Sequence, residues 1–149
     1  MYNDTITLFC RREDKRKSIT WYPHILSGIN LNIDAAAIAA KYGAESQDNV
    51  ALNIRYTPSP DGKFIGKCRW LPPKEWRRLT DVSGTLTFSG GNDFDFFMAG
   101  EWIDEQPVYD AEFGMDGFYD YMNATYDYVY AVTSVAEYSI IPHFEILAK

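Results

Sequence analysis

The stretch NVALNIRY, residues 49–56, decides the fold class of this chain of 149 residues. Val50, Leu52 and Ile54 recur at every second position, and a period of two predicts a β-strand with one buried face. The next residues, 57–62, contain two prolines and an Asp-Gly pair, which predict a turn that ends the strand. Short strands separated by such turns are typical of small antiparallel β folds.

Similar patterns lie on the N-terminal side. Residues 5–10 and 18–22 are predicted to form a hairpin whose tip, residues 11–17, is highly charged. Residues 29–33 alternate isoleucine or leucine with asparagine, which predicts a half-buried strand. Asp34 is expected to cap a short helix that ends before Gly43.

The C-terminal side predicts more strands and one more short helix. We expect a strand over 64–70, a helix over 72–79 that begins with prolines, a hairpin over 85–98 and a terminal strand pair over 128–147. The fold class is therefore mainly β (β-rich α+β): a small antiparallel β-barrel or sandwich with one or two short helices and a long acidic loop. A chain of this length suits a single domain, residues 1–149.

The long acidic loop covers residues 101–126, where aromatic and acidic side chains follow no clear period. A helical turn is expected near residues 118–123. Aperiodic segments of this length are uncommon inside a compact domain unless they are functional or flexible. Its aromatic side chains are either part of the core or contacts for assembly, and four of them are candidate assembly contacts: Trp102, Tyr109, Phe113 and Tyr119.

Charge is divided unevenly along the chain. Residues 1–78 contain 13 basic and 8 acidic side chains, whereas residues 79–149 contain one basic and 13 acidic side chains. A protein with opposite charge on two faces is complementary to a copy of itself, and its acidic face repels polyanions. This pattern favours an assembly component over a nucleic-acid-binding protein, which needs clustered cations.

This charge pattern predicts which charged residues make contacts in an assembly. Arg11, Arg12, Lys15 and Lys17 at the predicted hairpin tip are candidate contacts with an acidic neighbour, the alternative being a tip that is simply solvated. If the protein surrounds a channel for DNA, the acids that face the channel are expected among four residues: Asp93, Asp95, Asp104 and Glu105.

Catalytic and metal-binding patterns are weak. His24 and His143 are isolated, and no nucleophile, phosphate-loop or zinc motif occurs. Cys10 and Cys68 lie in apolar strand-like settings, which favours two buried thiols in a reducing cytoplasm over a disulfide. Acid pairs leave a small hydrolase as a remote alternative. We expect no enzyme activity and no cofactor.

The sequence shows neither the pattern of a secretion leader nor that of a membrane span. The first residues do not form a basic and then apolar leader, and no apolar run reaches the ~20 residues that span a bilayer. We therefore expect no membrane association.

Segments at both ends and in the middle of the chain carry a family resemblance: residues 1–9, Trp21, residues 26–30, residues 86–100, residues 126–135 and residues 143–146. In these segments the chain resembles a family of small phage and prophage structural proteins from Gram-positive hosts. Such proteins resemble head–tail connector or head-closure (stopper) proteins. The resemblance implies a non-enzymatic ring around the DNA channel, with copies of itself and portal, adaptor or tail proteins as partners. It also implies assembly in the host cytoplasm and then a place in the virion.

The long acidic loop departs from that family pattern, and an alternative function remains open. Exposed aromatic and acidic side chains, Trp102 and Tyr109 among them, would also suit a carbohydrate- or surface-binding module.

Overall fold

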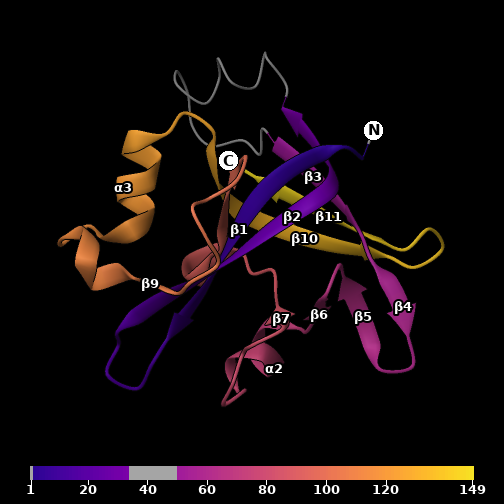
Figure 1. The fold of residues 1–149 in the computed structure, drawn as a ribbon, viewed down its shortest axis with the longest axis horizontal. Coiled ribbons are helices and arrows are strands. Elements are labelled where there is room, and N and C mark those ends of the chain that lie inside the picture. The colour runs from indigo at the N-terminus through magenta and orange to yellow at the C-terminus, as the bar shows by residue number, and fades with distance from the viewer. Residues whose placement is uncertain (1, 34–49) are drawn as a thin grey trace.

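A computed structural model describes residues 2–33 and 50–149 of the chain. Six antiparallel strands form a closed β-barrel in the order β1-β8-β10-β11-β3-β2, and pairing of β1 with β2 closes it (Figure 1). This confirms the predicted small antiparallel fold as a barrel and not a sandwich. The barrel strands are β1 (Asp4–Glu13), β2 (Ile19–Ile33), β3 (Val50–Arg55), β8 (Phe96–Ala99), β10 (Val129–Tyr138) and β11 (His143–Ala148).

Strand β2 allows the barrel to close because it pairs with two other barrel strands. Its first part pairs with β1, and residues 30–33 pair with β3. Between them the register shifts, because Asp4 lies opposite Ile29 while Thr5 lies opposite Ser27. The extra residue is Gly28, whose φ of +67° suits a β-bulge that bends the strand. The two strands predicted over 18–22 and 29–33 are therefore one bent strand.

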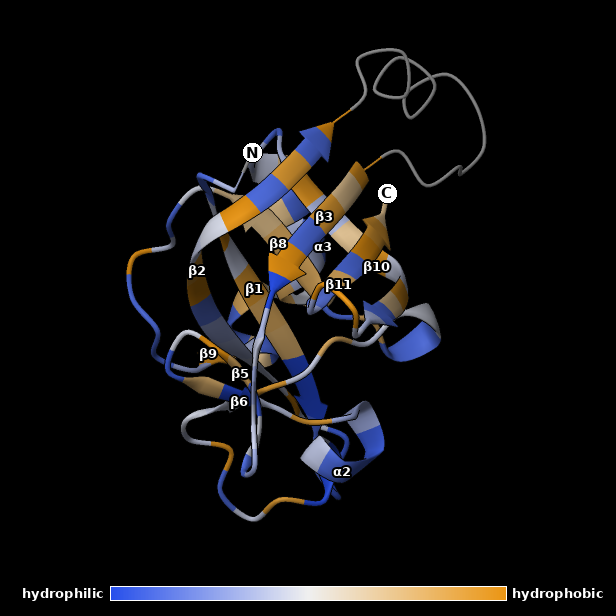
Figure 2. Ribbon diagram, turned by 90° about the vertical axis from the view of Figure 1, so that its right-hand side faces the viewer, coloured by the Kyte–Doolittle hydropathy of each residue, from blue (hydrophilic) through white to orange (hydrophobic). Residues whose placement is uncertain are grey.

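The barrel interior holds the larger of two hydrophobic clusters, which we call the inner core. The predicted alternation in β3 is confirmed, since Val50, Leu52 and Ile54 are all buried. Apolar and polar residues alternate along the strands in Figure 2. The other strands add side chains by the same period of two, among them Ile6, Leu8, Phe97, Tyr130, Phe144 and Ile146.

A second, four-stranded sheet lies at one end of the barrel and shares the inner core. The strand predicted over 64–70 is wrong in one respect, because a turn at Gly66 (φ +59°) divides it in two. The predicted turn over 57–62 contains a short strand. The prolines do begin a helix, anchored by the fully buried Trp76. The elements are β4 (Thr57–Ser59), β5 (Gly62–Ile65), β6 (Cys68–Trp70), α2 (Pro73–Arg77) and β7 (Thr85–Leu86).

The hairpin predicted over residues 85–98 is wrong. β7 pairs in parallel with β6, and β8 pairs with β1 and β10, with the 3-10 turn η1 (Gly91–Asp93) between β7 and β8. The chain instead passes close to β10, since a Cβ atom on Gly90 would lie 2.4 Å from the carbonyl oxygen of Thr133. Contacts with distant strands thus prevail over the local turn signal.

The long acidic loop folds over the outside of the barrel. It contains β9 (Val108–Tyr109), which pairs with β2, then η2 (Asp110–Phe113) and α3 (Gly117–Thr125), which confirms the helical turn predicted near 118–123. Beneath it is a second cluster, which we call the outer core: Phe9, Trp21, Phe96, Met98, Phe118, Met122 and Val129. The predicted terminal strand pair is confirmed as β10 and β11, whereas the helix predicted after Asp34 lies outside the described residues.

Candidate functional site

Residues 101–127, which we call the acidic cap, are fixed to the barrel through Asp110. Its Oδ1 atom accepts hydrogen bonds from Nε1 of Trp21 (2.9 Å) and from the backbone N–H of Phe118 (2.8 Å). Gly117 is required there, because its φ is +87° and a Cβ atom would lie 2.7 Å from Oδ2 of Asp110. One carboxylate thus joins β2, η2 and the start of α3.

The outer surface of the acidic cap carries negative charge without any positive charge. Its exposed acids are Glu101, Asp104, Glu105, Glu112, Asp116, Asp120 and Asp127. Within the part of the chain that the structure describes, the ion pairs are formed by other residues. Such a surface creates a local negative potential that repels phosphate.

The predicted aromatic contacts are mostly used inside the molecule. The Trp102 ring makes edge contacts with Phe9 (5.8 Å between centroids) and Phe118 (5.7 Å). Phe113 also packs on Phe118, and Tyr119 packs on Phe94 and Phe96. These three rings are partly buried, and among the four candidates only Tyr109, 54% exposed, lies on the surface.

The predicted basic contacts divide into two pairs. Arg11 forms an ion pair with Asp93 (3.1 Å), and the guanidinium of Arg12 donates to the Leu79 carbonyl and lies over the Trp76 ring. Both arginines therefore stabilise the fold. Lys15 and Lys17 are exposed at the turn between β1 and β2 and remain available for the predicted contacts.

The prediction that Asp95 faces a channel is wrong, because its side chain is fully buried. The carboxylate accepts backbone hydrogen bonds from Arg11 and Ser89, both 2.8 Å long. Burial raises its pKa to about 8, although these bonds and the nearby Arg77 act in the opposite direction. Asp95 fastens residues 89–95 to β1. The other three candidates, Asp93, Asp104 and Glu105, are exposed.

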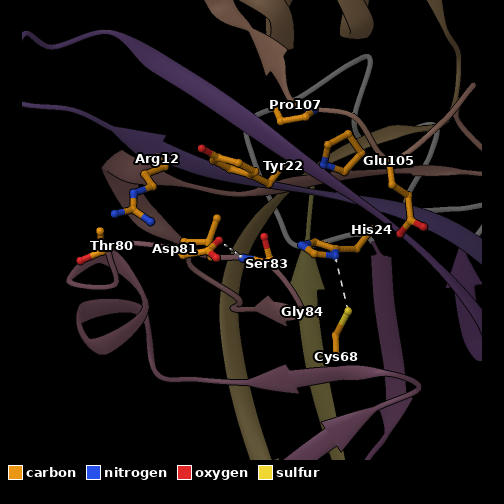
Figure 3. A pocket seen from close by; sticks show the side chains of 12 residues that line it. Arg12, Tyr22, His24, Cys68, Thr80, Asp81, Ser83, Gly84, Glu105 and Pro107 are labelled. Carbon is orange, nitrogen blue, oxygen red and sulfur yellow. Dashed lines mark hydrogen bonds between the residues drawn. The ribbon is translucent and has the colours of Figure 1, made fainter.

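A pocket of about 560 Å³ lies between β2, the loop 80–84 and the start of the acidic cap. Figure 3 shows His24 and Cys68 facing each other in it, with Nδ1 of His24 3.7 Å from Sγ of Cys68. Glu105 also lines the pocket, and its carboxylate accepts a hydrogen bond from the backbone N–H of Ile25 (3.1 Å). The sequence did not indicate this group, because its members lie on β2, β6 and the cap.

Thiol catalysis is not supported by the electrostatics of this pocket. Burial lowers the pKa of His24 to about 4, and burial together with Glu105 raises the pKa of Cys68. Both groups are thus neutral near pH 7, whereas an activated cysteine needs a lowered pKa. The second cysteine, Cys10, is buried, and burial raises its pKa as well.

In residues 2–33 and 50–149, no group of three metal-ligating side chains comes together. No helix in the same part of the chain is long and apolar enough to cross a membrane.

The fold and its surface thus define a closed six-stranded antiparallel β-barrel protein with an acidic cap on its outer side. The chain belongs to a family of unknown function, DUF6751, whose model matches residues 1–149. No curated protein and no solved structure matches the chain.

Proposed function

We propose that this chain is a non-enzymatic structural subunit of a phage virion, a head–tail connector or head-closure protein whose copies form a ring around the DNA channel. The observation that carries the proposal is the acidic cap, a surface with seven exposed acids and no base. A channel wall of this kind keeps a DNA duplex from adhering as it passes. The resemblance of both chain ends to phage structural proteins supplies the biological setting.

The chain has two surfaces of different charge, which supports assembly into a ring, because a ring needs head-to-tail contacts between different surfaces. Lys15 and Lys17 at the β1–β2 turn offer positive charge, although Glu13 and Asp14 lie beside them. The alternative, a carbohydrate-binding module, is less well supported. Of the two aromatic rings that it would use, Trp102 packs against Phe9 and Phe118, and Tyr109 alone is exposed.

Electron microscopy of the purified chain, alone and with a phage portal complex, tests the proposal. We expect rings, or density for the chain stacked on the portal. A chain that forms no ring and binds no portal in the presence of the complex would contradict the proposal.

Charge reversal tests which surfaces meet. The double variant Lys15→Glu, Lys17→Glu should weaken ring formation, and the matched variant Lys67→Glu, Lys74→Glu, which changes the same charge at exposed residues of the second sheet region, should not. Adding Asp116→Lys and Asp120→Lys should restore assembly of the first variant. Equal effects of both double variants would exclude a specific contact of the β1–β2 turn.

A further inference from the structure

Strand β10 continues beyond β8, its neighbour on one side. β8 pairs with residues 129–131 of β10, whereas the pairing of β10 with β11 continues to residue 138. Between these limits Val132 donates its N–H to the carbonyl oxygen of Asp95 (2.9 Å). Among the described residues, β11 is thus the only strand that pairs with residues 134–138. We call their other side, which faces away from β11, the open edge of β10 (Figure 1).

The open edge carries unpaired backbone groups. In an antiparallel strand, successive residues direct their N–H and C=O groups to opposite sides, so alternate residues among 134–138 point away from β11. In the part of the chain that the structure describes, no backbone hydrogen bond joins residues 134–138 to a segment other than β11. All of these residues except Val135 are exposed. A row of unpaired N–H and C=O groups is a template for pairing with a further strand.

Two other strand edges are closed to such pairing. Residues 10–13 of β1 also continue beyond β8, but the N–H of Arg11 donates to the buried carboxylate of Asp95 (2.8 Å). β4 forms an edge of the second sheet and contains Pro58, which has no N–H to donate. Covering segments and prolines are two of the ways in which natural proteins protect sheet edges.

The open edge of β10 has neither protection. Residues 134–138 include no proline, and their single charged side chain belongs to Glu137. This carboxylate forms an ion pair with Lys63 and accepts a hydrogen bond from the hydroxyl of Tyr56 (3.1 Å). Its charge is therefore balanced within the molecule. An edge that is unpaired and carries no net charge is typical of a site for strand addition.

A groove of about 570 Å³ lies beside the open edge. Its lining is mixed, because Trp70, Phe88 and Phe144 contribute aromatic rings, whereas Ser134 and Glu137 are polar. A peptide strand suits such a lining, since its backbone pairs with the edge while every second side chain points into the groove. The mixed lining and the unpaired backbone together indicate an extended peptide as the occupant and not a compact apolar ligand.

We propose that the open edge of β10 binds an extended segment of another protein as an added β-strand. The occupant is a strand of about five residues, roughly 17 Å long, with apolar side chains toward the groove and polar side chains toward solvent. Backbone hydrogen bonds supply the affinity, and the groove selects the side chains. The inference goes beyond the proposed function, because strand addition does not require that copies of the chain form a ring.

Hydrogen exchange with a model strand tests the proposal. The probe is a short synthetic peptide that alternates valine with threonine between terminal lysines. At saturating peptide, we expect exchange of alternate amides within residues 134–138 to slow by about tenfold, since each gains a backbone hydrogen bond. Amides of β4, whose edge contains Pro58, should not change. Unchanged exchange at residues 134–138 in millimolar peptide would overturn the proposal.

N-methylation of the same peptide separates strand pairing from other kinds of binding. Methylation of the valines and methylation of the threonines both preserve the side chains and the net charge, but they remove N–H donors from opposite sides of the strand. Only the donors that face β10 are needed for pairing. One methylated peptide should therefore bind about tenfold more weakly, while the other retains its affinity. Equal affinity of the two methylated peptides would exclude strand addition.

Paired variants locate the site on the chain. Ser134→Arg places a long charged side chain at the groove and should weaken binding of the model strand by about tenfold. Ser139→Arg, the same change at an exposed residue of the turn that follows β10, is the matched control and should leave binding unchanged. Circular dichroism should show that both variants remain folded, because both serines are exposed. Equal weakening by the two variants would mean that the added charge, and not the groove, governs binding.

Sedimentation velocity and hydrogen exchange without peptide distinguish a partner protein from a second copy. We expect residues 134–138 to exchange equally fast at low and high protein concentration, because the occupant is another protein. Protection of these residues that appears together with self-association would make a second copy the occupant and overturn the proposed partner. Microscopy with the portal complex decides the ring separately, so either proposal can fail while the other stands.

Discussion

The inner core and the outer core are built from opposite faces of the same strands, yet they are enclosed in different ways. In β1, Ile6 and Leu8 face the barrel interior, whereas Phe9 faces the acidic cap. The inner core is surrounded by a closed ring of strand pairings. The outer core is covered by a segment with one two-residue strand and a few side-chain hydrogen bonds. The cap can therefore open without opening the barrel, but the reverse does not hold.

The largest effect is expected from Phe144→Ala in the inner core. Phe144 is fully buried against the rings of Tyr56, Trp70 and Phe88. Its truncation leaves a cavity, so the free energy of unfolding should fall by about 3–5 kcal/mol. Urea denaturation measures this loss, and hydrogen exchange should become faster throughout the barrel. Faster exchange in the cap alone would contradict the comparison.

Phe118→Ala in the outer core is expected to have a smaller global effect, about 3 kcal/mol. The Phe118 ring contacts Phe9, Trp102 and Phe113. Because the barrel does not need the cap for closure, hydrogen exchange should accelerate in residues 101–126 and remain slow in β3 and β11. Uniform acceleration in both regions would show that the two cores unfold as one unit.

Acid should lower the free energy of unfolding through the buried side chain of His24. The folded-state pKa of about 4 is below the ordinary value of 6.5, so the neutral ring contributes stability above pH 6.5 that is lost as pH falls through 4. Relative to His24→Gln, the wild-type chain should lose about 3 kcal/mol between these pH values. Urea denaturation of both proteins across this range is the measurement, and parallel pH profiles would contradict it.

Asp110→Ala removes the acceptor for Trp21 Nε1 and the Phe118 N–H, which leaves both donors unpaired. We expect a loss of about 2 kcal/mol. Local proteolysis within the cap should increase before global unfolding changes. Asp127→Ala, at an exposed acid of the same segment, is the control and should change neither measurement.

Ile140→Asp should have the smallest effect on stability. Ile140 is 97% exposed, so the free energy of unfolding should change by less than about 0.5 kcal/mol. Thermal denaturation of the monomer at low concentration measures it. A large loss of stability would mean that the turn between β10 and β11 supports the barrel of its own chain.

Much of the fold could be predicted because strand alternation is a local property. The buried faces of β3 and the terminal pair β10–β11 follow directly from their side-chain periods. The prediction of a hairpin over 85–98 is wrong because strand pairing there is not local. The glycine turn satisfies local rules, but β8 forms its backbone hydrogen bonds with the distant strands β1 and β10.

Less of the candidate site could be predicted. The acidic surface at residues 101–127 was indicated by charge counts alone, because no base occurs nearby in sequence to neutralise it. The approach of His24 to Cys68 was not, since these residues are 44 positions apart and neither lies in a recognisable motif. The aromatic rings of the cap could not be divided into core and surface before their neighbours were known.

The amino-acid sequence by itself determined the β character of this protein, its turns and the sign of charge in each half, because these depend on neighbours along the chain and on composition. The tertiary structure alone decided that β2 bends at Gly28 to close the barrel, that Asp95 is buried and that seven acids of the cap face outward while Asp110 faces the barrel. These outcomes depend on backbone pairing and packing between distant segments. The free energy of such contacts exists only once the chain has brought them together.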